Sequence, residues 1–98
     1  MANSDHTLKT TENESYSLLK PIFPTLTKRQ IQVMKDLSVG MTPSQIQVKD
    51  QCSRTAIEKI LTDIRAEFGC SSSNEIRTVF LNNLLLKTLL IINLKKGE

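Results

Sequence analysis

Hydrophobic residues follow a helical period most clearly just after the middle of the chain. Four of them are separated by four, three and four positions, so they lie on one face of a helix. Ser53 precedes this run as a candidate N-cap, and Gly69 follows it, where a helix often ends in a residue with positive φ. The pattern predicts a third helix over residues 54–68, and its apolar face comprises Ile57, Leu61, Ile64 and Phe68.

Two earlier helices are predicted by capping boxes, in which a threonine and a glutamine three residues later bond to each other's backbone N–H groups. Thr27 and Gln30 open the first helix, and Thr42 and Gln45 open the second. Pro43 suits the first position of the second helix, where its missing N–H costs nothing. The first helix ends at a glycine, and its apolar side comprises Ile31, Val33, Met34 and Leu37.

The second helix is expected to be short because the sequence turns polar after Val48, and residues 49–51 are predicted as a connection. A short helix, a turn and a longer helix with a small polar outward face are typical of a helix-turn-helix that contacts DNA. A plain pair of antiparallel helices is the alternative. The outward face of the third helix comprises Thr55, Lys59, Thr62 and Ala66, with Glu58 on its flank.

A last helix is predicted over residues 73–96, opened by a third capping box between Ser72 and Glu75. Beyond residue 79 it is apolar over most of its circumference, which is more than one small core can bury. A membrane span is the competing explanation, but three asparagines and a lysine interrupt the run. We therefore expect self-association as a C2 dimer, with candidate contacts at Val79, Leu81, Leu85, Leu89 and Ile92.

The N-terminal arm, residues 1–25, precedes the helix-turn-helix core of residues 26–72. Up to about residue 15 it is polar and unpatterned, so a flexible, disordered arm is expected, with His6 as an exposed bystander. Two prolines then break an apolar run, which predicts one helical turn followed by an extended segment. This run is interpreted as a strap over the core, or alternatively as a docking site for another protein, through Leu18, Leu19, Ile22 and Phe23.

Composition favours an all-α domain. The 98 residues are 39% hydrophobic and only 4% aromatic, which suits helices better than a β-sandwich or barrel. The net charge of +3 is unevenly distributed. Residues 1–27 hold two basic and three acidic residues, a net of −1, which leaves eleven basic and seven acidic residues, a net of +4, on residues 28–98. The part expected to fold is therefore the basic part, which suits a surface that faces phosphates.

The sequence does not favour catalysis. Its single histidine lies in the arm, no nucleophile has a neighbouring base, and no glycine-rich phosphate loop is present, so neither an enzyme nor a cofactor is expected. Cys52 and Cys70 match no metal motif and are interpreted as buried free thiols, with redox or metal roles as the alternative. Free thiols and a polar N-terminus without a signal peptide favour a reducing cytoplasm.

Between Leu26 and about Phe80 a set of residues follows a known pattern without gaps: Leu26, Thr27, Arg29, Val33, Met34, Leu37, Gly40, Met41, Thr42, Ile46, Ser53, Ile57, Ile64, Phe68, Gly69 and Cys70. Through these residues the chain resembles the LuxR/GerE-type helix-turn-helix domain of bacterial transcription regulators. That resemblance implies a four-helix domain whose third helix enters the major groove of double-stranded DNA and whose fourth helix forms the dimer contact.

The resemblance also implies roles for individual residues. Glu58, Lys59 and Thr62 would face base edges, and Thr27, Arg29, Thr42 and Thr55 would approach phosphates. Arg54, at the start of the third helix, and Lys28 complete the candidate DNA-binding set. Lys28 and Arg29 lie in the first turn of a helix, where they oppose the helix dipole, so either a phosphate partner or ordinary solvation explains them.

The chain departs from the family pattern in its third helix. Residues 56–60 read Ala-Ile-Glu-Lys-Ile, where the family usually has Thr-Val-Lys-x-His, and the helix has three basic and three acidic side chains. Gln47 replaces a small residue and Asp50 an apolar one. Two functions remain open. One is a stand-alone transcription regulator that binds specific DNA as a homodimer. The other is a protein-binding modulator that sequesters a related regulator through its apolar last helix.

Overall fold

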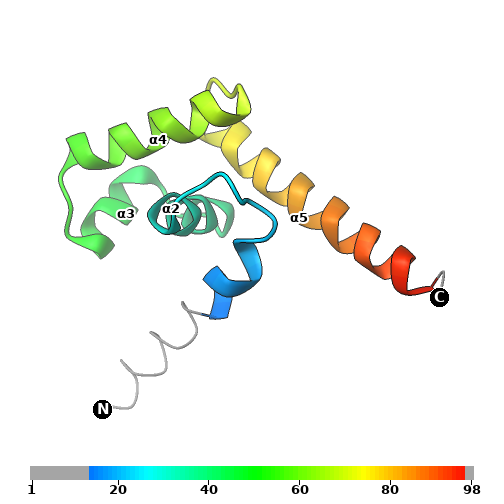
Figure 1. Ribbon diagram of the computed structural model, residues 1–98. Helices are drawn as coiled ribbons and strands as arrows, with labels where there is room; N and C mark the ends of the chain where they lie inside the picture. Colours follow the sequence, from blue (N-terminus) through cyan, green and yellow to red (C-terminus); the bar gives the residue numbers. More distant parts are fainter. Residues whose placement is uncertain (1–13, 97–98) are drawn as a thin grey trace, which may run out of the picture.

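The computed structural model describes residues 14–96, which form helices and turns without a strand (Figure 1). A short helical segment, residues 14–19, precedes α2 (Lys28–Ser38), α3 (Pro43–Asp50), α4 (Arg54–Phe68) and α5 (Ser73–Lys96). This confirms the all-α class. The predicted disordered stretch, including His6, lies largely outside the described residues.

The first two predicted capping boxes are confirmed. The Gln30 N–H donates to Thr27 Oγ1 at 3.1 Å, and the Thr27 N–H donates to Gln30 Oε1 at 2.9 Å. Thr42 and Gln45 make the same two bonds at the start of α3, at 3.2 and 2.9 Å. Both helices therefore begin where their local sequence satisfies the backbone N–H groups that a helix leaves unpaired.

The ends of α4 are also as predicted, but the third capping box is only half right. Ser53 Oγ accepts from the Ala56 N–H at 3.1 Å, and Gly69 closes α4 with a φ of 67°. At the start of α5 the Glu75 N–H donates to Ser72 Oγ at 3.2 Å. The Glu75 carboxylate, however, accepts from the N–H and hydroxyl of Ser71, one residue earlier than a capping box requires.

The predicted end of α3 is wrong, because the helix continues through Lys49 and Asp50 instead of ending at Val48. Both side chains form ion pairs with residues of α2, so tertiary contacts support a last turn that the polar sequence alone does not favour. The helix ends at Gln51, whose φ of 53° places it in the left-handed region.

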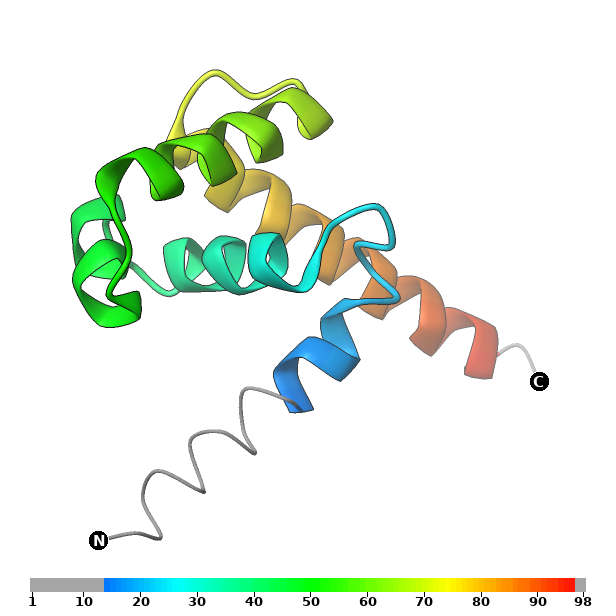
Figure 2. The same cartoon turned by 60° about the vertical axis from the view of Figure 1, so that its left-hand side comes forward.

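The core lies around α2, which contacts α3, α4 and α5 (Figure 2). The predicted apolar faces of α2 and α4 are buried there, except that Phe68 is half-buried. Phe23 joins the N-terminal segment to this core. Its ring stacks on the Phe80 ring, with the ring centres 5.4 Å apart, and meets the Phe68 ring edge-on, with the centres 6.1 Å apart.

Of the four residues assigned to the strap, Leu19 and Phe23 are buried and Ile22 packs against the core, whereas Leu18 is 74% exposed. The segment is also not extended. The N–H groups of Ile22 and Phe23 both donate to the Leu19 carbonyl at 3.0 Å, which makes a tight turn. The fixed φ of Pro21 is compatible with such a turn, so the proline marks a change of direction and not an extended strand.

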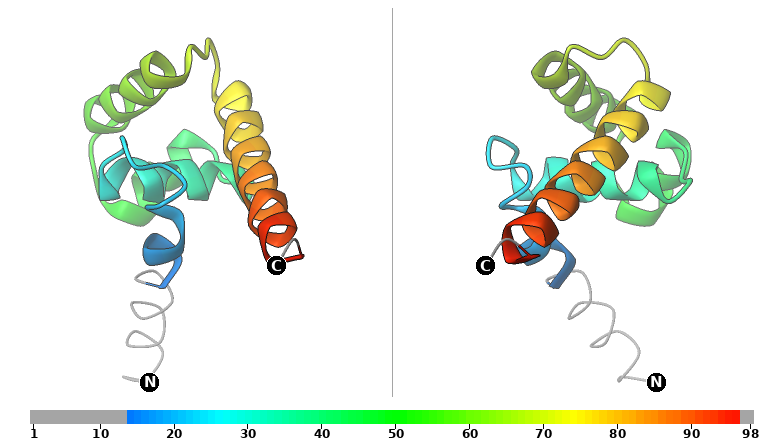
Figure 3. Two further views of the ribbon diagram at one scale, coloured as in Figure 1. Left: turned by 45° about the vertical axis from the view of Figure 1, so that its right-hand side comes forward. Right: turned by 90° about the vertical axis from the view of Figure 1, so that its right-hand side faces the viewer.

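Helix α5 packs on the core only through its first half. Ile76 and Phe80 are buried and Leu84 is partly buried, whereas the following turns extend past the other helices (Figure 3). Arg77 fixes this first half, because its guanidinium donates to the carbonyls of Leu37 at 2.7 Å and Met41 at 3.1 Å. Within residues 14–96, none of the helices has the length and apolar character needed to cross a membrane.

Candidate nucleic-acid interface

The candidate interface is the outward side of α4 together with the edge of α3 that faces it. Ile57, Leu61 and Ile64 anchor α4 in the core with at most 1% of each residue exposed. The opposite side of the helix is solvent-accessible, as the helical period predicts. It carries the exposed residues Thr55, Glu58, Lys59, Thr62 and Ala66.

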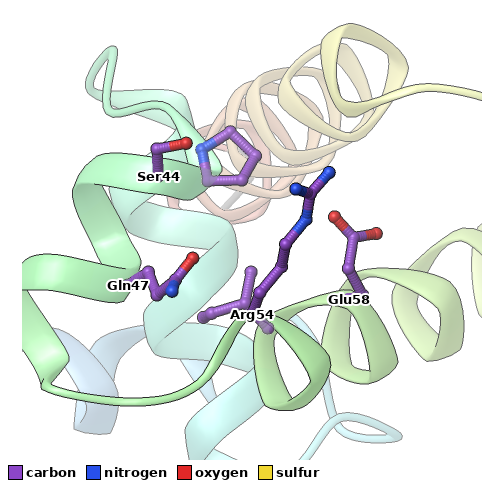
Figure 4. Close-up of a pocket in the computed structure, with 6 residues that line it drawn as sticks. Ser44, Gln47, Arg54 and Glu58 are labelled. Atoms are coloured by element: carbon purple, nitrogen blue, oxygen red, sulfur yellow. The ribbon is translucent and has the colours of Figure 1, made fainter.

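A hollow of about 440 Å³ separates the first turns of α4 from α3 (Figure 4). Arg54 and Glu58 extend side by side from α4, and Ser44 and Gln47 face them from α3 (Figure 4). Sequence reasoning did not select Ser44, and it noted Gln47 only as a departure from the family pattern. Helical spacing could have found both, since they lie three residues apart on a helix that begins at Pro43.

The charges on α4 partly satisfy one another. Lys59 Nζ lies 3.6 Å from Asp63 Oδ2, but the two side chains are 78% and 46% exposed, so the pair is weak and readily exchanged. The Arg65 guanidinium donates to the Thr62 hydroxyl at 3.2 Å. Lys59 can therefore turn towards an anion at little cost, whereas Thr62 has a neighbour that competes for its oxygen.

Arg29 is half-buried and is held by contacts with its neighbours. Its Nη1 donates to Asp50 Oδ2 at 2.6 Å, and its Nη2 approaches Cys52 Sγ at 3.6 Å. Lys49 Nζ binds the other Asp50 oxygen at 2.5 Å and lies 3.1 Å from Asp36 Oδ2. Asp36 is buried, and the ion pair with Lys49 offsets the cost of burying its charged carboxylate. This network joins α2 to α3.

The network raises the pKa of Arg29 and of Lys49 and lowers the pKa of Asp50. Burial alone would raise the pKa of the Asp50 carboxyl, but the hydrogen bonds from Lys49 and Arg29 outweigh burial and hold that pKa below its ordinary value of 3.8. Burial would lower the pKa of Lys49, but hydrogen bonds to Asp50 and Asp36 raise it above 10.5. Asp50 and Lys49 are therefore both charged near neutral pH.

The remaining candidate phosphate ligands are spread over the starts of α2 and α3. Thr27 and Thr42 are exposed, but their hydroxyl oxygens already accept the capping bonds, which leaves their O–H groups to donate. Lys28 Nζ lies 5.2 Å from the centre of the Tyr16 ring, a cation–π contact. The structure thus gathers Arg54 and Glu58 with α3, and places Thr27 and Lys28 on a separate helix start.

The candidate dimer residues on α5 divide into two groups. Val79 is half-buried and packs against the protein's own core. The other four form an exposed stripe at spacings of four, four and three residues, which falls on one side of a helix. We call this set the α5 stripe; it comprises Leu81, Leu85, Leu89 and Ile92.

The cysteines are not the buried thiols that the sequence suggested. Cys52 and Cys70 are free but only half-buried, since each lies in a connection at the edge of the core. Burial and the nearby Glu75 carboxylate raise the pKa of the Cys70 thiol, which disfavours its reactive thiolate form. Over residues 14–96, no cluster of three His, Cys, Asp or Glu side chains is placed to hold a metal ion.

The chain matches no known protein family, no curated protein and no solved structure. The resemblance to LuxR/GerE domains therefore rests on the sequence of this chain alone.

Proposed function

We propose that this protein is a bacterial, cytoplasmic transcription regulator of the LuxR/GerE type that binds specific double-stranded DNA as a homodimer. In this proposal α3, residues 51–53 and α4 are a helix-turn-helix, and α4 enters the major groove. One observation carries the proposal: α4 is anchored in the core through Ile57, Leu61 and Ile64, while its opposite, polar face is exposed beside α3.

The exposed side chains of α4 match the chemistry of base edges. Lys59 and Arg54 can donate to the N7 and O6 acceptors of guanine. Thr62 can contact the thymine methyl group through its own methyl group, or form a hydrogen bond with a base edge through its hydroxyl. Glu58 can accept from the amino group of cytosine. It would be repelled by nearby phosphates where that hydrogen bond is not made, so it would select sequence at a cost in affinity.

Phosphate contacts are assigned to the helix starts. Thr27, Thr42 and Thr55 have hydroxyl groups to donate, and Lys28 adds a positive charge. Arg29 belongs to this set only when a phosphate replaces the Asp50 carboxylate that now accepts from it at 2.6 Å. Asp50 thus weakens the contribution of Arg29.

The homodimer is assigned to the α5 stripe. Pairing two copies would present two α4 helices to one DNA molecule, so that binding of the second helix becomes intramolecular and overall affinity rises. This matters here because the three basic side chains of α4 are balanced by three acidic ones, which makes a single helix a weak ligand for DNA.

The same two observations favour a second candidate function. A neutral α4 and an exposed apolar α5 also suit a modulator that captures a related regulator in an inactive heterodimer. In that case α5 binds protein and α4 does not bind DNA.

Selection from random double-stranded DNA separates the two candidates. We expect the wild-type protein to enrich a motif, and the triple variant Thr55→Ala, Lys59→Ala, Thr62→Ala to lose that enrichment. A control removes one exposed threonine and one exposed lysine that lie outside α4 and the α5 stripe, Thr25→Ala with Lys87→Ala, and should keep it. No motif from the wild type, together with a stable complex between the chain and a related regulator, would favour the second candidate.

A further inference from the structure

A second hollow, of about 410 Å³, lies away from α3 and α4. Its walls are the helical segment of residues 14–19, the C-terminal end of α2 and the middle of α5. Most of the lining is apolar, and two of its side chains, Leu18 and Val39, are 74% and 72% exposed. We call this hollow the α2/α5 groove. Large apolar side chains gathered around a concave surface indicate a site for an apolar partner.

We propose that the α2/α5 groove receives residues 89–94 of a second copy of this chain, in an antiparallel C2 dimer. The proposal deepens, and rests on, the homodimer part of the proposed function. It does not depend on DNA binding. It adds Leu18 and Val39 to the interface, although neither lies on α5.

The groove and the α5 stripe are one continuous surface. Leu81 is the first residue of the stripe and also lines the groove, together with Leu84 on the adjacent side of the helix. A helix that packs along the stripe therefore runs directly over the groove. An interface restricted to α5 would leave Leu18 and Val39 exposed beside it.

The position of the groove decides the orientation of the two helices. If the two-fold axis passes between Leu85 and Leu89 and the helices are antiparallel, the second copy's Ile92 lies beside Leu81, at the groove. In a parallel pair each residue of the stripe would lie beside its own copy. The end of each helix would then stay away from the groove, which would remain open.

The composition of the helix end suits this site. Residues 89–94 comprise five apolar residues and one asparagine, and all six are exposed. The chain's own residues 1–13 are a poorer occupant because they are mostly polar.

Sedimentation equilibrium of two matched variants tests the groove. Val39 and Val48 are both exposed, at 72% and 79%, and each lies at the end of a helix, but only Val39 lines the groove. We expect Val39→Asp to raise the dimer Kd at least about tenfold, because it places a charge in an apolar contact, and Val48→Asp to leave it unchanged. Leu85→Asp, on the stripe, should also weaken the dimer.

The other outcomes distinguish loss of the groove contact from loss of the dimer. Equal Kd values for Val39→Asp and Val48→Asp, with Leu85→Asp monomeric, would overturn the groove contact but leave a dimer through α5. A monomeric wild type at about 100 μM, where even a weak biological dimer should form, would overturn the dimer as well. Neither result measures DNA binding, so failure here is distinguishable from failure of the α4 assignment. Circular dichroism of each variant should match the wild type, so that a folding defect is not mistaken for dissociation.

Cysteine cross-linking tests the orientation. In a chain with Cys52→Ser and Cys70→Ser, single variants Val39→Cys and Ile92→Cys are oxidised separately and as a mixture. The antiparallel arrangement predicts a covalent dimer in the mixture and little in either variant alone. A covalent dimer of Ile92→Cys with itself, and none with Val39→Cys, would show a parallel pair and contradict the proposal.

Discussion

Asp50 has the most connected side chain between α2 and α3. Its two oxygens accept separately from Arg29 and Lys49, at 2.6 and 2.5 Å, and Lys49 continues to the buried Asp36. Sequence analysis could identify Asp50 as a polar residue where the family has an apolar one. It could not predict the ion pairs, because Arg29 and Asp50 are 21 positions apart and their proximity depends on how the helices pack.

Replacing Asp50 with Asn should lower the free energy of unfolding at pH 7 by about 1–2 kcal/mol, because two charge-assisted hydrogen bonds are weakened in a half-buried place. The folded carboxyl has a lower pKa than the ordinary 3.8, so its stabilisation is complete above that value and is lost as pH falls through the folded pKa. Urea unfolding at several pH values measures the difference.

The matched control is Asp63→Asn, which removes an exposed ion pair with Lys59 at 3.6 Å and should change the unfolding free energy by less than about 0.5 kcal/mol. A destabilisation by Asp50→Asn that stays the same as the pH falls well below 3.8 would show that the charge of Asp50 does not stabilise the fold.

Glu58→Lys tests whether this residue faces DNA. Removing a negative charge and adding a positive one should strengthen non-specific binding. The slope of log K against log salt should become steeper by up to about 0.9 for each additional phosphate that the protein neutralises. Glu58→Gln, which only removes charge, should give a smaller effect. An unchanged salt slope for Glu58→Lys would place Glu58 off the DNA surface.

At the scale of the helices, local sequence predicted where helices begin better than where they end. Thr27, Thr42 and Ser53 cap as predicted because a cap depends on residues only three positions apart. The end of α3 could not be placed, since it depends on ion pairs with α2. The extended segment predicted from the prolines is wrong for a similar reason. The turn found there is accompanied by contacts of Phe23 with Phe68 and Phe80, which are distant in the sequence.

Thr42→Ala should lower the free energy of unfolding by about 1 kcal/mol, because the Gln45 N–H loses its acceptor at 3.2 Å. Thr55→Ala removes the same atoms from an exposed position inside α4 and should be neutral or slightly stabilising, since alanine favours helix. Thermal or urea unfolding followed by circular dichroism compares them. Equal stability of the two variants would show that the α3 cap contributes little.

At the scale of the whole molecule, two surfaces remain after the core is formed: the polar side of α4 and the apolar length of α5. Helical period predicted both, because each is a face of a single helix. It could not predict the hollow between α3 and α4 or the α2/α5 groove, because each is assembled from elements that only the packing brings together.

If α5 forms the dimer, folding and association are coupled. The midpoint of thermal unfolding should then rise by several degrees between about 2 and 200 μM protein, because mass action favours the dimer. Leu85→Asp should remove this dependence. A midpoint that stays constant over this range in the wild type would argue against an obligate dimer.

The most direct test of DNA binding through α4 is the affinity of Lys59→Ala for the selected DNA site, compared with Lys87→Ala. Both variants remove one exposed lysine from a helix, but Lys87 lies on α5. Fluorescence anisotropy at fixed salt should show binding weakened about tenfold or more for Lys59→Ala and nearly unchanged for Lys87→Ala, with identical helical circular dichroism. Equal affinity of the two variants would contradict the assignment of α4 to the DNA surface.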